Sequence, residues 1–386
     1  MQRRDFLSLA AGSAVTAWMP AALAAVPGDY AYRNLLVLVE LKGGNDGLNT
    51  VVPYADPNYY RLRPRIGIKR EEVLQLSERA GLHPSLGALM PLWQGRELAV
   101  IQGLGYPNPN QSHFRSIEIW DTASKSEEYL NEGWLARAFA ANPVPKGFVA
   151  DGVVIGSQEM GPFSGGARAV ALSNTEQFMR QARLATPSAR RGNAALAHIL
   201  KVEGEIVQAA SHLGSGVPIQ LLTAFPTGEF GNALRTASQV IANQAGVAAV
   251  RVTLNGFDTH QNQPGQQANL LKQLGDGLAA FRAALVELNR WNSALVMTYA
   301  EFGRRAAENN SNGTDHGTAN VHFVMGGQVR GGLYGQVPQL DRLDNGNLAY
   351  AIDFRSLYAT VLEKWWGNDA KVSLGGRFQP IDLIRS

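Results

Sequence analysis

Cysteine is absent from this 386-residue sequence. Disulfide bonds and thiolate ligands are therefore excluded, and any bound metal must be held by oxygen and nitrogen donors. The sequence also lacks a marked excess of charge of either sign, because its 35 Lys and Arg residues are nearly balanced by 32 Asp and Glu residues. The resulting net charge of +3 is too small to indicate binding to nucleic acid or to a membrane surface. Long apolar runs are missing too, so that none reaches the ~20 residues of a membrane-spanning helix.

The first 24 residues have the pattern of an export signal. Arg3 and Arg4 form a twin-arginine pair, an apolar stretch follows from Leu7 to Met19, and Ala22-Leu23-Ala24 has the small residues of a cleavage site. The pattern predicts a mature chain that begins at Ala25. We expect the twin-arginine export machinery to deliver it to the periplasm or outside the cell, with no membrane span after processing. An uncleaved anchor and a buried first helix are the alternatives.

Residues 25–386 contain no linker rich in Pro and Ser, which predicts a single domain. Apolar runs predict buried strands of a mostly parallel sheet at Leu35–Glu40, Leu98–Gln102, Val217–Leu222, Ala249–Leu254, Ala294–Ala300 and Val321–Met325. Apolar residues at spacings of three and four predict helices at Gln266–Arg290 and Phe354–Trp366. The stretch 144–166, rich in Gly, Val and Pro, predicts a small β-excursion over the sheet. Strands that alternate with helices indicate an α/β fold.

Three acidic residues, Asp46, Asp258 and Glu301, each follow a predicted strand. Sites in open α/β sheets form outside the carboxyl ends of strands, so we expect these side chains to meet at one edge. Asp46 lies in a Gly-Gly-Asn-Asp-Gly loop and would be a metal carboxylate, with Asn45 and Asn49 in contact with substrate oxygens. An Asx turn that caps a helix is the alternative for this loop.

A second motif, Gln111-Ser112-His113-Phe114, precedes a predicted helix at Phe114–Thr122. Ser112 would lie near the N-terminus of that helix, where backbone N–H groups favour an anion. A metal that lowers the pKa of its hydroxyl would make it a nucleophile. Arg115 would hold an oxygen of a phosphate or sulfate group, and His113 would contact substrate. The alternative is that Ser112 only caps the helix.

Further histidines stand next to carboxylates in Asp258-Thr259-His260 and in Asp315-His316, and His322 follows shortly after. Imidazoles and carboxylates in such loops suit a hard or borderline divalent cation. The spacing predicts metal ligation by both pairs, with His322 reaching a second ion. Glu301 would be a base, a ligand or an ion-pair partner. The other histidines, His83, His198 and His212, lie outside any motif and are expected to have structural roles.

In order along the chain, the export signal and five motifs resemble the DUF1501 family of exported bacterial proteins. The motifs are Gly-Gly-Asn-Asp-Gly, Gln-Ser-His-Phe, Phe-Asp-Thr-His-Gln-Asn-Gln, Glu-Phe-Gly-Arg and Thr-Asp-His-Gly. That family is similar to the alkaline phosphatase and sulfatase superfamily. The resemblance implies an alkaline-phosphatase-like fold, a central mostly parallel mixed sheet between helix layers.

The resemblance also implies two metal ions. One would be held by Asp46, Ser112, Asp315 and His316, and the other by Asp258, His260 and His322. The sequence departs from the superfamily in two places. Only one residue separates Asp258 from His260, where three are common. Phe114 and Ser116 also stand where a formylglycine sulfatase needs Pro and Arg, which favours direct attack by Ser112.

These patterns predict an exported hydrolase of phosphate or, less readily, sulfate esters, with one or two divalent ions (Zn, Mn, Mg or Ca) as cofactors. Its substrate would be an anionic ester that a glycan could carry. An exported scaffold or assembly protein that retains the fold is the main alternative, and a binding protein for anionic glycans is the third.

Overall fold

The computed structural model describes residues 31–172, 220–242 and 246–385. Within them, nine strands form one mixed sheet in the order β11-β5-β10-β9-β1-β8-β6-β7, with β12 paired to β5. The strands are β1 (Leu35–Lys42), β5 (Leu98–Gly105), β6 (Ala150–Ile155), β7 (Ala169–Leu172), β8 (Val247–Asn255), β9 (Ala294–Tyr299), β10 (Asn320–Met325), β11 (Gly332–Tyr334) and β12 (Ile352–Asp353). Only β10 runs antiparallel to its neighbours, so the expected mostly parallel mixed sheet is confirmed.

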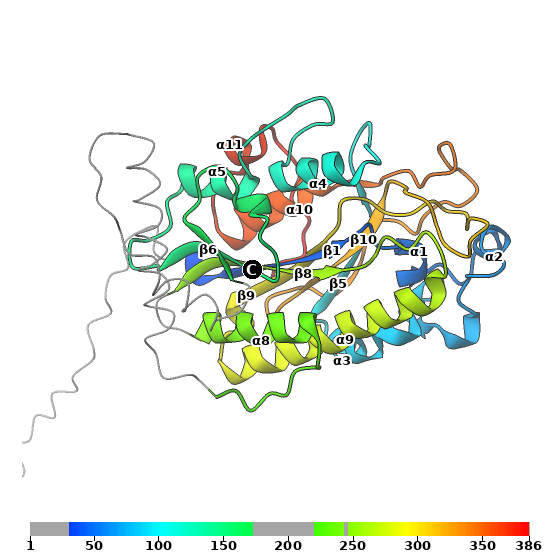
Figure 1. Cartoon of the computed structure of the whole chain (residues 1–386), viewed down its shortest axis with the longest axis horizontal. Helices are drawn as coiled ribbons and strands as arrows, with labels where there is room; N and C mark the ends of the chain where they lie inside the picture. The colour runs from blue at the N-terminus through cyan, green and yellow to red at the C-terminus, as the bar shows by residue number, and fades with distance from the viewer. Residues whose placement is uncertain (1–30, 173–219, 243–245, 386) are drawn as a thin grey trace, which may run out of the picture.

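Helices cover both faces of this sheet, as predicted (Figure 1). One face carries η3 (Pro84–Leu89), α3 (Met90–Gln94), α8 (Glu229–Ala242) and α9 (Gln263–Glu287). The opposite face carries α4 (His113–Thr122), α5 (Trp134–Ala141), α10 (Phe354–Ala359), the π-helical turn η6 (Thr360–Trp365) and α11 (Ala370–Leu374). The shorter elements are η1 (Ala31–Arg33), α1 (Gly47–Thr50), α2 (Pro57–Leu62), η2 (Arg70–Glu72), η4 (Gly161–Phe163), η5 (Trp291–Ser293), and a small sheet of β2 (Val51–Val52), β3 (Leu74–Gln75) and β4 (Gly81–Leu82).

The predicted helices form because their apolar stripes become buried. In α9 the side chains of Leu271, Leu274, Leu278 and Phe281 are fully buried against the sheet. Burial of each such side chain stabilises the fold by ~1.5–3 kcal/mol. The helix predicted at 354–366 is present as α10 followed by η6.

Two predictions about strands are wrong. Of the strand expected at Val217–Leu222, residues 217–219 lie outside the described part, and residues 220–222 form no strand. Leu222 is 91% exposed, and its N–H is held by a carboxylate of α9 at 2.7 Å instead of a neighbouring strand. The stretch 144–166 forms no excursion over the sheet, because β6 pairs with β8 and belongs to the main sheet.

Parallel pairing brings several chain segments to one edge of the sheet. Because β1, β8 and β9 run in the same direction, the loops after them all emerge at their carboxyl ends. The antiparallel β10 begins at this edge, so residues 315–319 lie there as well. Helix α4 follows β5, which pairs antiparallel with β10, and it therefore starts at the same edge.

His83 gives this fold a pH-dependent stability. Its side chain is 4% exposed, its Nδ1 accepts the N–H of Ser85 at 3.1 Å, and burial lowers its pKa to about 4. Between pH 6.5 and 4 the unfolded chain binds a proton that the folded chain does not, so stability falls as the pH falls. We expect His83→Asn, which keeps an acceptor for the cap, to remove about 3 kcal/mol of this acid-linked loss. Denaturant titrations of both proteins at pH 7 and pH 4 measure the difference; parallel pH profiles would contradict it.

Candidate functional site

A cluster of imidazoles surrounds one carboxylate oxygen at the carboxyl edge of the sheet. Asp258 Oδ1 lies 3.4 Å from His113 Nε2, 3.1 Å from His260 Nε2 and 3.2 Å from His316 Nε2. The Nε2 atoms of His260 and His316 are 2.9 Å apart. Arg304 also donates to Asp258 Oδ1 at 2.7 Å. Four segments distant in sequence therefore converge on a single oxygen atom, which we call the Asp258 cluster.

Each imidazole of the cluster has its other nitrogen next to an oxygen acceptor. The pairs are His113 Nδ1 with Glu301 Oε1 at 2.8 Å, His316 Nδ1 with the Gln111 carbonyl at 2.8 Å, and His260 Nδ1 with Asp315 Oδ1 at 3.4 Å. With a cation at the centre of the cluster, these acceptors would hold the proton of each ring on Nδ1 and direct the Nε2 lone pair at the ion. Metal-binding histidines are oriented by outer partners of this kind.

Charge in the cluster keeps its carboxylates ionised. Burial is the largest single influence on Asp258 and opposes its ionisation, but the hydrogen bond from Arg304 and the charges of Arg304, His113 and His260 together outweigh it and lower the pKa of Asp258. The pKa of Asp315 is lowered chiefly by a hydrogen bond from Asn309 Nδ2, 3.1 Å away. Burial lowers the pKa of His316, which favours the neutral imidazole that a metal requires.

The Glu301 carboxylate orients His113 from a buried position. Glu301 is 2% exposed, and its Oε1 accepts the backbone N–H of Gly43 at 2.9 Å as well as the imidazole. The hydrogen bond between the Glu301 carboxylate and the His113 ring raises the pKa of His113. Glu301 Oε2 is buried without a partner among the described residues. The sequence left three roles open for Glu301, and the geometry gives it that of an orienting partner for His113.

Arg304 joins the loops that carry the cluster. Its guanidinium is fully buried and donates to Asp258 and to the backbone carbonyls of Gly43, Gly44, Phe257 and Thr314. Gly43 and Gly44 have positive φ angles, and a side chain on either would collide with Asp258 backbone or the Phe302 ring. Sequence reasoning missed this role, although Arg304 closes the Glu-Phe-Gly-Arg motif.

The donors of the cluster fit a divalent cation. His113, Asp258 and His316 each place a ligand atom within 4.8 Å of the others, and His260 Nε2 lies within 3.1 Å of two of them. A tetrahedral zinc ion with bonds of ~2.0–2.1 Å would hold its ligand atoms ~3.3–3.4 Å apart, close to the spacings around Asp258 Oδ1. The side chains of His260 and Asp258 are 43% and 48% exposed, so the cluster is open to a ligand from solvent.

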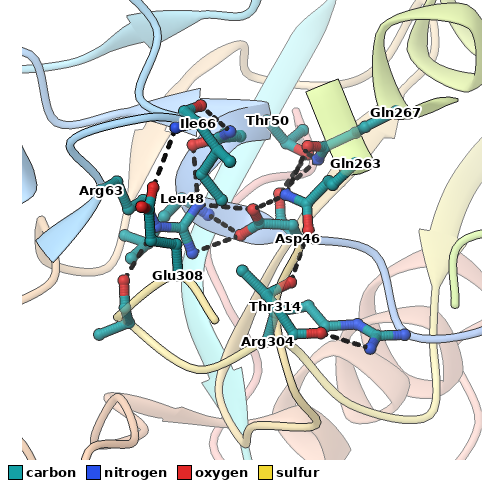
Figure 2. Close-up of polar contacts among 12 residues, drawn as sticks. Asp46, Leu48, Thr50, Arg63, Ile66, Gln263, Gln267, Arg304, Glu308 and Thr314 are labelled. Carbon is teal, nitrogen blue, oxygen red and sulfur yellow. Dashed lines mark hydrogen bonds and ion pairs between the residues drawn. The ribbon is translucent and has the colours of Figure 1, made fainter. Parts of the chain in front are cut away.

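Asp46 has different partners from those of the cluster (Figure 2). Its carboxylate is 1% exposed and forms two contacts with the Arg63 guanidinium, at 2.5 and 2.9 Å. Gln263 Nε2 donates to Oδ2 at 2.5 Å, and the N–H of Leu48 donates to Oδ1 at 3.2 Å. Asp46 thus caps α1 within a buried ion pair, and the structure does not bring it to Asp258. No sequence motif marked Arg63 as its partner.

Three residues predicted to contact substrate have internal partners. Asn45 bonds to Thr50 and Gln267, and Asn49 bonds to the Ile66 carbonyl, Tyr59 and Arg63. Arg115 donates to the carbonyls of Lys125, Ser126 and Glu128, and its guanidinium stacks on the Tyr129 ring. These contacts hold loops in place.

His322 lies in the interior and not in the cluster. It is on β10, fully buried, with Nδ1 3.3 Å from Thr298 Oγ1 and its ring against Trp120. Burial lowers its pKa to about 3. Its Nε2 has no partner among the described residues. The structure therefore does not bring together the residues that the resemblance implies for two ions, since both Asp46 and His322 lie apart from Asp258.

Ser112 occupies the position before the first turn of α4. It has the backbone geometry of a cap, yet its side chain makes no capping hydrogen bond. Its own N–H donates to Asn110 Oδ1 at 2.8 Å, and the residue is exposed. The next residue, His113, belongs to the Asp258 cluster. The hydroxyl therefore makes no capping bond at the N-terminus of α4, one residue before a member of the cluster.

The protein thus has an α/β fold with a mixed sheet. The histidine and carboxylate cluster at the carboxyl edge of this sheet has the donor groups of a divalent-cation site. The chain belongs to the DUF1501 family, because a family model described as "Protein of unknown function (DUF1501)" matches residues 71–381. No curated protein matches the chain.

Three solved structures with a similar fold are a periplasmic domain, a sulfatase and an alkaline phosphatase. The C-terminal periplasmic domain of EcEptC from Escherichia coli has 12% identity and a TM-score of 0.42, covering 89% of this chain and 86% of that one. PsFucS1 sulfatase from Pseudoalteromonas sp. has 11% identity and a TM-score of 0.40, with 90% and 70% covered. A TAB5 alkaline phosphatase with Mg bound has 11% identity and a TM-score of 0.34, with 78% and 94% covered. Similarities this weak give the present chain no substrate and no residue roles.

Proposed function

We propose that this protein is an exported metal-dependent hydrolase of phosphate or related esters, with one divalent cation held at the Asp258 cluster. The observation that carries the proposal is the convergence of three imidazole Nε2 atoms on Asp258 Oδ1, each with its Nδ1 beside an acceptor. A donor set rich in imidazole favours zinc over manganese, magnesium or calcium. The bound ion would supply Lewis acidity that polarises an ester oxygen.

The protein's own residues would prepare the site for that ion. Glu301 and Asp315 would hold the rings of His113 and His260, while Arg304 keeps Asp258 ionised. The fixed guanidinium of Arg304 would also add positive charge next to an anionic substrate. Neither Asp46 nor His322 is placed with these groups, which supports one ion in preference to two.

Ser112 is the proposed nucleophile. Its hydroxyl makes no capping bond, and it precedes both His113 and the first turn of a ten-residue helix, whose N–H groups favour an anion. Attack of Oγ on the ester phosphorus would release the alcohol and leave a phosphoserine, which water would then hydrolyse.

Export is part of the proposal. The signal predicted at residues 1–24 lies outside the described residues. Among the residues that the structure describes, none forms a helix long and apolar enough to cross a membrane. A periplasmic or secreted protein delivered by the twin-arginine machinery agrees with this finding, and the N-terminal mass of the exported protein tests the expected start at Ala25.

The function is tested by turnover of aryl phosphate and aryl sulfate by the zinc-loaded and manganese-loaded protein, alongside Ser112→Ala. We expect Ser112→Ala to lose most turnover and all trapped phosphoserine while its melting temperature stays within about 2 °C of wild type, because Ser112 makes no cap bond. Ser126→Ala, which removes a half-buried hydroxyl bonded to the Asn108 carbonyl, is the control for loss of a serine hydroxyl outside the site. Full turnover by Ser112→Ala would remove Ser112 from the reaction. Absence of turnover in every metal-loaded sample would favour the scaffold alternative.

A further inference from the structure

A cavity of about 450 Å³ opens beside the sheet edge that carries the Asp258 cluster. Its walls come from Gln102 on β5, the start of α1 at Gly47, the start of β10 at Asn320, the loop 335–342 and the segment 348–352. None of these residues belongs to the cluster. The volume falls within the ~300–1,000 Å³ of ordinary ligand sites.

The lining of this cavity contains an amide that the fold does not use. Gln102 is 3% exposed and lines the cavity, yet its side chain makes no hydrogen bond to any residue that the structure describes. The amide is accessible only through the cavity, so a ligand bound there can make the hydrogen bonds that no described protein group makes with it. Gln336, Gln339 and Arg342 also line the cavity, and their side chains make no hydrogen bond or ion pair within the same described part.

We propose that this cavity, the Gln102 pocket, binds the sugar portion of an acidic carbohydrate. A carboxamide donates and accepts hydrogen bonds at once, which matches the donor and acceptor character of sugar hydroxyls. The ring of Tyr350, 43% exposed in the wall, and the side chains of Val337 and Ile352 offer apolar surface to the C–H face of a sugar ring. The Arg342 guanidinium suits a carboxylate, phosphate or sulfate on that sugar.

Short contacts connect the Gln102 pocket to the Asp258 cluster. Asn320 Nδ2 in the pocket wall donates to the Phe302 carbonyl at 3.0 Å, and the Phe302 ring lies 4.6 Å from the ring of His316. Gln111 accepts from His316 Nδ1 and donates to Asn347 at 3.2 Å, next to the pocket segment that begins at Leu348. An ester group at the cluster and a sugar in the pocket would thus belong to one substrate. This link rests on the proposed function, whereas sugar binding does not.

The test measures binding of two trisaccharides, acidic trigalacturonate and neutral maltotriose, to chelator-treated protein by saturation-transfer NMR and calorimetry. We expect trigalacturonate to bind more tightly than maltotriose. Gln102→Met should weaken binding by roughly tenfold or more, since the buried hydrogen bonds to the sugar are lost. Its melting temperature should hold or rise, because the amide makes no bond within the described fold. Gln75→Met, the same change at an exposed site on β3, is the matched control.

Ala349 and Arg342 are exposed, so substitutions at these two positions should leave the fold intact. Ala349→Trp should fill the Gln102 pocket and abolish binding of both sugars, and Arg342→Gln should remove the preference for the acidic one. Unchanged binding in Gln102→Met and Ala349→Trp, binding of neither sugar, or binding of trialanine instead would overturn the proposal. Because no metal or turnover is involved, these outcomes are separate from failure of the hydrolase proposal.

Discussion

Asp258→Ala is expected to lose the bound metal, falling from about one ion per folded chain to almost none, together with ester hydrolysis. Asp258 Oδ1 is the only oxygen on which the Nε2 atoms of His113, His260 and His316 all converge within the described residues. Loss of an outer partner such as Glu301 typically weakens metal binding ~10–100-fold, and loss of a direct ligand should cost more. Glu301→Gln should therefore keep a weakened site, whereas Asp258→Ala and His316→Ala should not.

Metal analysis of purified protein and melting with and without chelator are the measurements. An ion that binds only the folded state stabilises it by about 2.7 kcal/mol when its concentration is about 100 times Kd. The chelator should lower the melting temperature of wild type and leave Asp258→Ala unchanged. His322→Asn and Asp46→Asn are informative controls, because both residues lie outside the cluster and should retain the ion. Loss of metal in these two variants together with retention in Asp258→Ala and His316→Ala would overturn the cluster as the metal site.

Continuous apolar runs made most of the sheet predictable from sequence. Runs such as 35–40 and 294–300 are apolar because β1 and β9 are buried on both faces. The place of β6 in the main sheet was not predicted, because Asp151 and Gly152 interrupt its apolar pattern; Arg168 on the neighbouring loop satisfies the Asp151 carboxylate at 2.6 Å. The strands β11 and β12 have three and two residues, too few to carry a recognisable period.

The position of loops at the carboxyl edge of the sheet also made part of the site predictable from the sequence. Asp258 and His260 follow β8, and Asp315 and His316 precede β10, so topology alone places them side by side. What sequence could not supply was the partner of each carboxylate. An acid after a strand has the same pattern whether it faces a metal or an arginine, and Asp258 and Asp46 differ only through contacts made by residues distant in sequence. His322 lies within the buried run of β10 and not in a loop, so its interior position depends on the strand and not on the neighbouring Asp-His motif.

Arg63→Met is expected to lower the free energy of unfolding by about 3–5 kcal/mol, the usual cost of leaving one charge of a buried ion pair uncompensated. Arg63 and Asp46 have side chains 0% and 1% exposed, and their atoms approach to 2.5 Å. Arg63 also donates to the Ala306 and Arg305 carbonyls at 2.9 and 3.0 Å, so its loss leaves further acceptors without partners. Arg61→Met, on the exposed side of α2, is the matched control and should change stability by no more than about 0.5 kcal/mol.

The double variant Asp46→Asn with Arg63→Met separates charge from packing. If the cost of Arg63→Met comes from the unpaired carboxylate, neutralising Asp46 should restore part of it, and the two losses should not add. Denaturant unfolding of the four proteins of this cycle, each in chelator, measures the coupling without any metal. If Asp46 were instead a metal ligand whose carboxylate Arg63 keeps from binding the ion, Arg63→Met would increase the metal content and would cost little stability in chelator. A loss below about 1 kcal/mol with a second bound ion would therefore return Asp46 to the metal site.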